Sequence, residues 1–125
     1  MNINKFTQKS LQAVQDCEKI AMDYGNQEIE QEHLLYALLT QDDGLIPKMI
    51  EKMGLDIGVV TQCVEQAIAG RTKVQGGKQY VGQDLNNVLV HAEDEAKQMG
   101  DEYVSVEHLF LAMLRYPSRA MKGIF

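Results

Sequence analysis

Three histidines and two cysteines are the residues of this chain whose types suit acid–base, nucleophilic or metal chemistry. His33 and His108 each directly follow a glutamate, Glu32 and Glu107. A histidine beside a carboxylate suits a general base or a metal ligand. Neither histidine, however, has a second His or Cys at ligand spacing in its segment, and the sequence contains no His-Glu-x-x-His. We therefore interpret both as packed histidines, each hydrogen-bonded near the start of a helix.

The other candidate residues also lack the partners that chemistry would need. His91 and Glu95 lie four residues apart on one predicted helix face, but two ligands do not make a metal site, and a solvated pair is the simpler interpretation. Cys17 and Cys63 stand alone in helical patterns without a nearby histidine, which predicts small buried apolar residues. The sequence thus predicts no catalytic residue and no metal site.

A nucleotide site is not expected either. A phosphate-binding loop reads Gly-x-x-x-x-Gly-Lys followed by Ser or Thr. The nearest match, Gly77-Lys78, has Thr72 in place of the first glycine and Gln79 after the lysine. We expect no cofactor in this chain.

The segment that holds His33 occurs twice. Residues 32–39, Glu-His-Leu-Leu-Tyr-Ala-Leu-Leu, return as residues 107–114, Glu-His-Leu-Phe-Leu-Ala-Met-Leu, with a shift of 75 residues. The same shift relates further positions on both sides of the chain: Gly25 and Gly100, Asn26 and Asp101, Ile29 and Val104. This register predicts an internal duplication within a single domain over residues 1–125.

The spacing of apolar residues predicts helices throughout, so the expected fold class is all-α, with two pseudo-twofold-related helical repeats. Repeat one (1–70) holds four helices, which begin near Thr7, Gln31, Pro47 and Asp56. An exposed linker (71–81) with Gly76-Gly77 follows. Repeat two (82–125) repeats the first three helices, with Ser105 and Ser118 at the starts of the last two. The counterpart of the fourth helix would lie beyond residue 125, so we expect a longer polypeptide with a truncated second repeat here.

The composition limits the classes of partner. The formal charge of −6 disfavours a nucleic-acid surface, because phosphate contacts need clustered Lys and Arg. No uncharged apolar run approaches the roughly 18 residues of a membrane helix, and the N-terminus lacks the apolar region of a secretory signal. We expect a cytoplasmic protein with protein partners, and no nucleic acid or membrane.

Three segments carry a recognisable pattern: Met1-Asn2-x-x-Lys5-Phe6-Thr7, residues 29–39 and residues 100–109. Together they resemble, over the whole chain, the N-terminal Clp repeat domain of ClpB-type disaggregase chaperones. The resemblance implies an all-α domain tethered to a ring-forming double ATPase. Such a domain is expected to capture unfolded or aggregated client proteins and deliver them to the ring, and adaptors are further expected partners. ATP and magnesium belong to the ATPase part of such proteins, which form hexameric rings, whereas the N-domain alone is expected to be monomeric.

The resemblance also implies candidate binding residues. Thr7, Asp101 and Glu107 match positions that are implicated in substrate handling in ClpB-like N-domains. As helix-end residues, Thr7 and Glu107 also stabilise helices by about 1 kcal/mol or less each. An apolar groove is expected as well, and the residues chosen for its lining are Leu89, Val90, Val104, Phe110, Tyr80 and Val81.

The alternative is a ClpC-like domain that docks adaptors or phosphoarginine for a protease. Helix N-termini at Glu32 and Glu107 would suit an anion. ClpC-like sequences, however, usually carry Gly-Thr before this Glu-His, whereas Glu30-Gln31 and Ser105-Val106 stand there. The carboxylate of Glu30 would repel a phosphate, which favours the ClpB-like interpretation. An enzyme with a site assembled from both repeats would instead need a deep pocket around His33 or His108.

Overall fold

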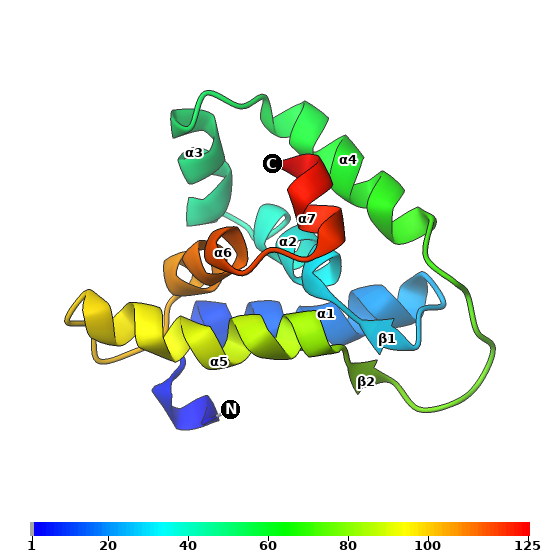
Figure 1. Cartoon of the computed structure of the whole chain (residues 1–125), viewed down its shortest axis with the longest axis horizontal. Coiled ribbons are helices and arrows are strands. Elements are labelled where there is room, and N and C mark those ends of the chain that lie inside the picture. The colour runs from blue at the N-terminus through cyan, green and yellow to red at the C-terminus, as the bar shows by residue number, and fades with distance from the viewer. Residues whose placement is uncertain (1) are drawn as a thin grey trace.

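The computed structural model describes residues 2–125 and is mostly helical (Figure 1). In chain order, its elements are η1 (Ile3–Lys5), α1 (Gln8–Asp23), β1 (Glu28–Ile29), α2 (Gln31–Leu39), α3 (Leu45–Lys52), α4 (Ile57–Ala69), β2 (Tyr80–Val81), α5 (Gln83–Gln98), α6 (Val106–Arg115) and α7 (Arg119–Ile124). The predicted all-α class is confirmed, with only two strands of two residues each in the described part. None of the helices in residues 2–125 combines the length and the apolar character needed to cross a membrane.

Local capping explains where several helices begin. The hydroxyl of Thr7 accepts from the backbone N–H of Ser10 at the start of α1, as the sequence predicts. Asp56 accepts from the first N–H groups of α4, and the hydroxyl of Ser118 accepts from Met121 in α7. Each cap satisfies a backbone donor that the helix itself leaves unpaired.

The centre of the molecule is α2, which is surrounded by other helices (Figure 1). Gln31 to Leu35 are all buried, and Leu34, Leu35 and Leu38 are fully enclosed. Helix α1 packs on α2, and α5 packs on α6. Across the molecule, α2 meets α5 and α7, whereas α6 meets α1 and α3. These helix pairs follow the 75-residue register of the sequence.

Two short backbone pairings link the halves of the chain. Strands β1 and β2 are parallel, with Ile29 opposite Val81, and Phe6 forms an equivalent parallel bridge with Val104. The N–H of Gly82 donates to the carbonyl of Ile29 at 2.8 Å, and the N–H of Thr7 donates to the carbonyl of Val104 at 2.9 Å. Each of these bonds joins one half of the chain to the other.

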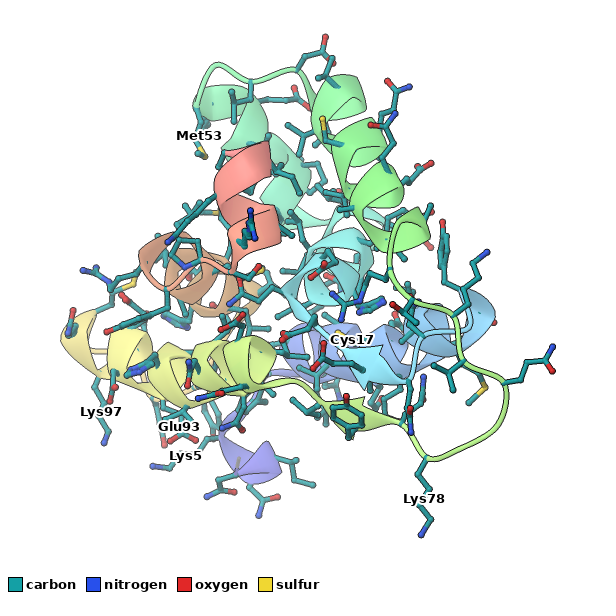
Figure 2. All side chains as sticks on the ribbon, turned by 45° about the vertical axis from the view of Figure 1, so that its right-hand side comes forward. Lys5, Cys17, Met53, Lys78, Glu93 and Lys97 are labelled. Carbon is teal, nitrogen blue, oxygen red and sulfur yellow. The ribbon has the colours of Figure 1, made fainter. Side chains whose placement is uncertain are left out.

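The linker over residues 71–81 is more firmly attached than the sequence suggested. Most of it is exposed, and Lys78 points away from the body (Figure 2). Its ends, however, bond to repeat one: the N–H of Val74 donates to the carbonyl of Gly25, and the N–H of Tyr80 donates to that of Gln27. The linker is thus mostly exposed, and two long-range backbone bonds, for which the sequence carries no periodic signal, attach it to repeat one.

The two cysteines differ in burial. Cys17 lies in the core, as predicted, and burial raises the pKa of its thiol. Cys63 is only half-buried, which corrects the prediction for that residue.

Candidate functional site

Each repeat contains the same histidine clasp. Nδ1 of His33 accepts from the N–H of Glu30 at 2.9 Å, and its Nε2 lies 3.0 Å from Oδ1 of Asn26. Because Nδ1 is an acceptor, the ring proton is assigned to Nε2, which donates to the amide oxygen. His33 is fully buried. The clasp therefore fixes the connection before α2 to the first turn of that helix.

The second clasp replaces the amide with a carboxylate. Nδ1 of His108 accepts from the N–H of Ser105 at 2.8 Å, and its Nε2 lies 2.8 Å from Oδ2 of Asp101. His108 is 1% exposed. Both nitrogens of each histidine are thus engaged in structural bonds, which confirms the prediction of packed histidines.

The environment of His33 also argues against acid–base work. Burial, helped by the nearby positive charge of Arg71, lowers the pKa of His33 from 6.5 to about 4. The imidazole is therefore neutral near pH 7, and its one free lone pair already accepts from Glu30. A general base needs an available lone pair within reach of a substrate proton.

A cluster of anionic oxygens lies at the start of α6. Single ligand atoms of Asp101, Glu107 and His108 all lie within 4.8 Å of one another, and the hydroxyl of Ser105 donates to Glu107 at 3.3 Å. A metal ion would have to displace one of the existing bonds to His108. The exposed carboxylate of Asp101 and the half-buried one of Glu107 are instead suited to accept hydrogen bonds from a ligand.

The third predicted residue, Thr7, is joined to this cluster through the backbone. Besides capping α1, Thr7 donates its N–H to the carbonyl of Val104 at 2.9 Å, and Ser10 donates its hydroxyl to the same carbonyl at 2.7 Å. Val104 lies between Asp101 and Glu107 in the chain. The structure thus attaches the start of α1 to the connection that carries both acidic residues.

The six residues predicted to line an apolar groove fall into two groups. Tyr80, Val81 and Val90 are 52%, 46% and 51% exposed. Leu89, Val104 and Phe110 are at most 6% exposed and belong to the core, so the predicted lining is corrected for these three. Successive helix residues point about 100° apart, so of two neighbouring positions on α5 one can face the core and the next the solvent.

Among the other exposed apolar residues, two that were not predicted lie in the segments next to Thr7 and Asp101. Ile3 in η1 is 55% exposed, and Tyr103, which directly precedes Val104, is 50% exposed. Both lie in segments without helical periodicity, and the sequence signal for them is only their apolar type. Large exposed apolar side chains that lie near one another are typical of interaction surfaces.

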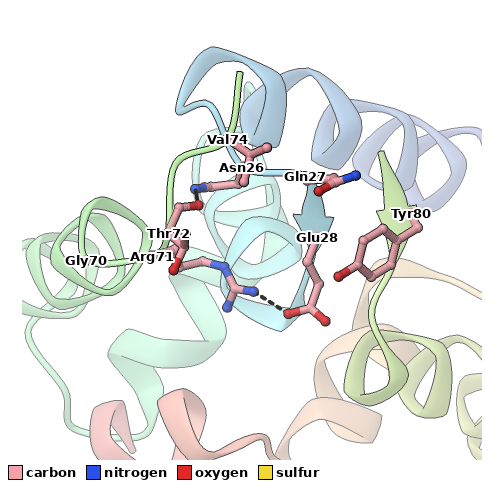
Figure 3. Close-up of a pocket in the computed structure, with 8 residues that line it drawn as sticks. All are labelled: Asn26, Gln27, Glu28, Gly70, Arg71, Thr72, Val74 and Tyr80. Atoms are coloured by element: carbon pink, nitrogen blue, oxygen red, sulfur yellow. Dashed lines mark hydrogen bonds and ion pairs between the residues drawn. The ribbon is translucent and has the colours of Figure 1, made fainter. Parts of the chain in front are cut away.

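The counterpart of the acidic cluster in repeat one is already occupied. Glu32 stands at the position of Glu107, but it is 3% exposed and pairs with Nη1 of Arg71 at 3.0 Å. Nη2 of Arg71 reaches Glu28 at 2.6 Å, which Figure 3 shows beside a hollow of about 470 Å³ between the linker and the connection before α2. Of the two matching glutamates, Glu32 is engaged, whereas Glu107 is half-buried and open to a partner.

This chain is similar to known proteins in both sequence and fold. The profile of a family described as the Clp repeat (R) N-terminal domain matches residues 5–125. The chaperone protein ClpB of Nitratidesulfovibrio vulgaris is 41% identical over 128 residues, which cover 98% of this chain. The chain spans only 15% of the length of that relative.

Two solved structures share the fold. The Hsp104 N-terminal domain from Candida albicans superposes with a TM-score of 0.84 at 19% identity, over 97% of this chain and 79% of that one. A ClpV N-domain in complex with a VipB peptide superposes with a TM-score of 0.80 at 22% identity, over 98% of this chain and 78% of that one.

Proposed function

Because this chain belongs to the family of Clp repeat (R) N-terminal domains, we propose that it recognises substrates for an ATP-driven protein disaggregase. In this role it captures unfolded or aggregated polypeptide and delivers it to an ATPase ring. The chain itself is a helical N-domain rather than a catalytic ATPase domain. ATP and magnesium would act elsewhere in the full protein, for which we propose a hexameric ring in the cytoplasm. The 41% identity of this chain to a ClpB supports the proposal.

The observation that carries the proposal is the arrangement at the start of α6. Asp101 and Glu107 present carboxylate oxygens beside the backbone that anchors Thr7. Unfolded chains expose amide N–H groups and cationic side chains. Both kinds of group donate hydrogen bonds to carboxylates. The cluster thus offers binding that does not depend on one client sequence.

Exposed apolar residues supply the second part of the recognition. Tyr80 and Val81 in β2 and Val90 on α5 present apolar surface to solvent. Unfolded or aggregated clients expose the apolar side chains that folded proteins bury. The few exposed residues imply weak capture, which suffices for a module held near a ring at high effective concentration. The peptide bound to the ClpV N-domain supports a peptide-binding use of the fold.

The test is a titration of this domain with a permanently unfolded protein, followed by fluorescence anisotropy. We expect Glu107→Gln and Thr7→Ala to weaken binding by about three- to tenfold, the loss of roughly one hydrogen bond. Thr7→Ser keeps the hydroxyl that caps α1, so affinity lost in Thr7→Ala and kept in Thr7→Ser traces to the hydroxyl rather than to the methyl group. Glu51→Ala, an exposed carboxylate on α3, is the control for net charge. Equal affinity in all variants would remove these residues from the site.

A second candidate is a ClpC-like domain that docks adaptors or phosphoarginine. The N-terminus of α6, with Glu107 available for a guanidinium, favours it. Two observations weigh against it: Asp101 adds a second negative charge where the phosphate would lie, and Glu32 is occupied by Arg71. Saturable binding of free phosphoarginine that Glu107→Gln abolishes, without binding of the unfolded protein, would favour this candidate.

A further inference from the structure

Helix α5 is capped by a residue of the other repeat. Its N-cap is Gly82, which has no side chain to accept a hydrogen bond. Instead, Oε1 of Glu30 accepts from the N–H of Leu85 in the first turn of α5, at 2.8 Å. Glu30 is the N-cap residue of α2 in repeat one. Its carboxylate therefore joins repeat one to repeat two.

The fit between Glu30 and Gly82 is close. Glu30 is 7% exposed, and a Cβ atom built on Gly82 would approach its carboxylate far inside any real contact distance. The carboxylate therefore fills the space that a side chain at position 82 would take. In the 75-residue register, Thr7 stands at the place of Gly82 and caps α1 with its own hydroxyl, while Ser105 stands at the place of Glu30. The cap of repeat one is local, and that of repeat two is supplied across the interface.

Charged groups face Glu30 from every element around it. Glu28 on β1, Glu32 on α2, Asp84 on α5, Arg71 in the linker and Arg119 on α7 line one small hollow with it. Arg71 is engaged by Glu28 and Glu32, and His33 on α2 accepts from the backbone of Glu30. A negative charge on Glu30 is therefore placed among other carboxylates with little access to water.

These surroundings shift the ionisation of Glu30. Burial is the main cause that raises the pKa of Glu30 from 4.5 to about 7, and the carboxylates of Asp84, Glu28 and Glu32 add to it. The hydrogen bond from Leu85 acts in the opposite direction. In a conformation where α5 has moved away, water would restore the ordinary value.

We propose that Glu30 is a proton-sensitive joint between the two repeats, which holds the start of α5 and the adjoining strand β2 on repeat one more tightly when its carboxyl is protonated. Opening of the joint releases the proton to water, so a rise in pH between about 4.5 and 7 favours the open form. Strand β2 carries Tyr80 and Val81, whose exposed side chains belong to the candidate apolar surface. The joint thus links the placement of those side chains to pH, and it does not depend on the proposed function.

The test is amide hydrogen exchange of the whole chain, read as protection factors at Leu85 and Gly82 between pH 5 and pH 8. As the pH rises, we expect the protection factors to fall on the order of 100-fold, since one pKa unit corresponds to a tenfold change. Most of this fall should occur below pH 7, and the protection factors should stay level above it. Glu30→Gln keeps an acceptor oxygen but cannot ionise. In this variant, protection at Leu85 and Gly82 should therefore not fall with rising pH. The N–H of Ser10, capped by Thr7 in repeat one, is the internal control.

A second measurement does not require a variant. A carbon-13 NMR titration of the Glu30 carboxyl should give a midpoint near 7. A midpoint near the ordinary 4.5 would overturn the proposal, as would the same pH profile of protection at Leu85 in the parent chain and in Glu30→Gln.

Discussion

Nε2 of His108 lies 2.8 Å from Oδ2 of Asp101, whereas the matching histidine, His33, meets the amide of Asn26 at 3.0 Å. The two clasps have the same geometry but differ in charge. Asp101 thus combines two tasks, since one oxygen holds a buried imidazole while the exposed carboxylate remains available to a partner. Substitutions can separate these tasks.

Asp101→Asn should keep the fold and lose the charge. The amide oxygen can accept from Nε2 as Asn26 does in repeat one, so we expect the free energy of unfolding to change by less than about 1 kcal/mol. Asp101→Ala should cost roughly 1–3 kcal/mol, because it leaves the buried Nε2–H without an acceptor. Urea unfolding measures both variants. Equal losses in the two would show that charge, rather than an acceptor, stabilises the clasp.

Val90→Ala and Leu89→Ala should separate binding from stability. Val90 is 51% exposed and Leu89 is 6% exposed. We expect Leu89→Ala to destabilise the domain by about 2–5 kcal/mol and Val90→Ala by about 0.5 kcal/mol or less. In the titration with an unfolded protein, Val90→Ala should weaken binding although the fold is intact. Unchanged affinity would remove Val90 from the apolar surface.

Arg71→Ala should destabilise the domain by about 3 kcal/mol, because it leaves the buried carboxylate of Glu32 without its partner. The matched control is Lys48→Ala, whose ion pair with Asp43 is exposed on both sides and should be worth less than about 1 kcal/mol. Combining Arg71→Ala with Glu32→Gln should recover part of the loss. Chemical denaturation gives all three values. A loss at Arg71 no greater than at Lys48 would contradict a structural role for the linker.

Gly82→Thr should destabilise the domain by about 1–3 kcal/mol or more, since the new side chain meets the carboxylate of Glu30. Adding Glu30→Ser reproduces the residues at the two matching positions, Thr7 of repeat one and Ser105 of repeat two, and should restore most of the stability. A double-mutant cycle by thermal unfolding measures the coupling. If the two effects simply add, the two residues do not share the same space.

Glu30→Gln should make stability depend more steeply on pH. The pKa of Glu30 is raised on folding, so its contribution falls as pH rises from about 4.5 to 7. The pKa of His33 is lowered on folding, so its contribution rises between about 4 and 6.5. The two oppose each other in the parent chain. In Glu30→Gln the His33 effect remains, and stability should increase by roughly 2 kcal/mol from pH 4.5 to 6.5.

Calorimetry of both proteins over that pH range checks this prediction. His33→Gln should have the reverse effect, with stability that decreases as pH rises toward 7. Parallel pH profiles in the parent chain and in Glu30→Gln would contradict the opposition of the two groups.

The sequence by itself determined the helices, their local caps and the packed histidines. The caps at Thr7, Asp56 and Ser118 join residues at most three positions apart, so residue type and spacing suffice to predict them. The 75-residue register likewise paired Asn26 with Asp101 and His33 with His108, and the structure then shows the same contact within each repeat.

Only the tertiary structure decided which side chains are open and which are engaged across the molecule. Glu30 meets Leu85 and Arg71 meets Glu32 over separations of 55 and 39 residues, and no local pattern encodes such contacts. Leu89 and Val90 have similar apolar side chains, yet one enters the core and the other faces solvent. Their exposure depends on which face of α5 packs on α6, and therefore on the arrangement of both helices rather than on either segment alone.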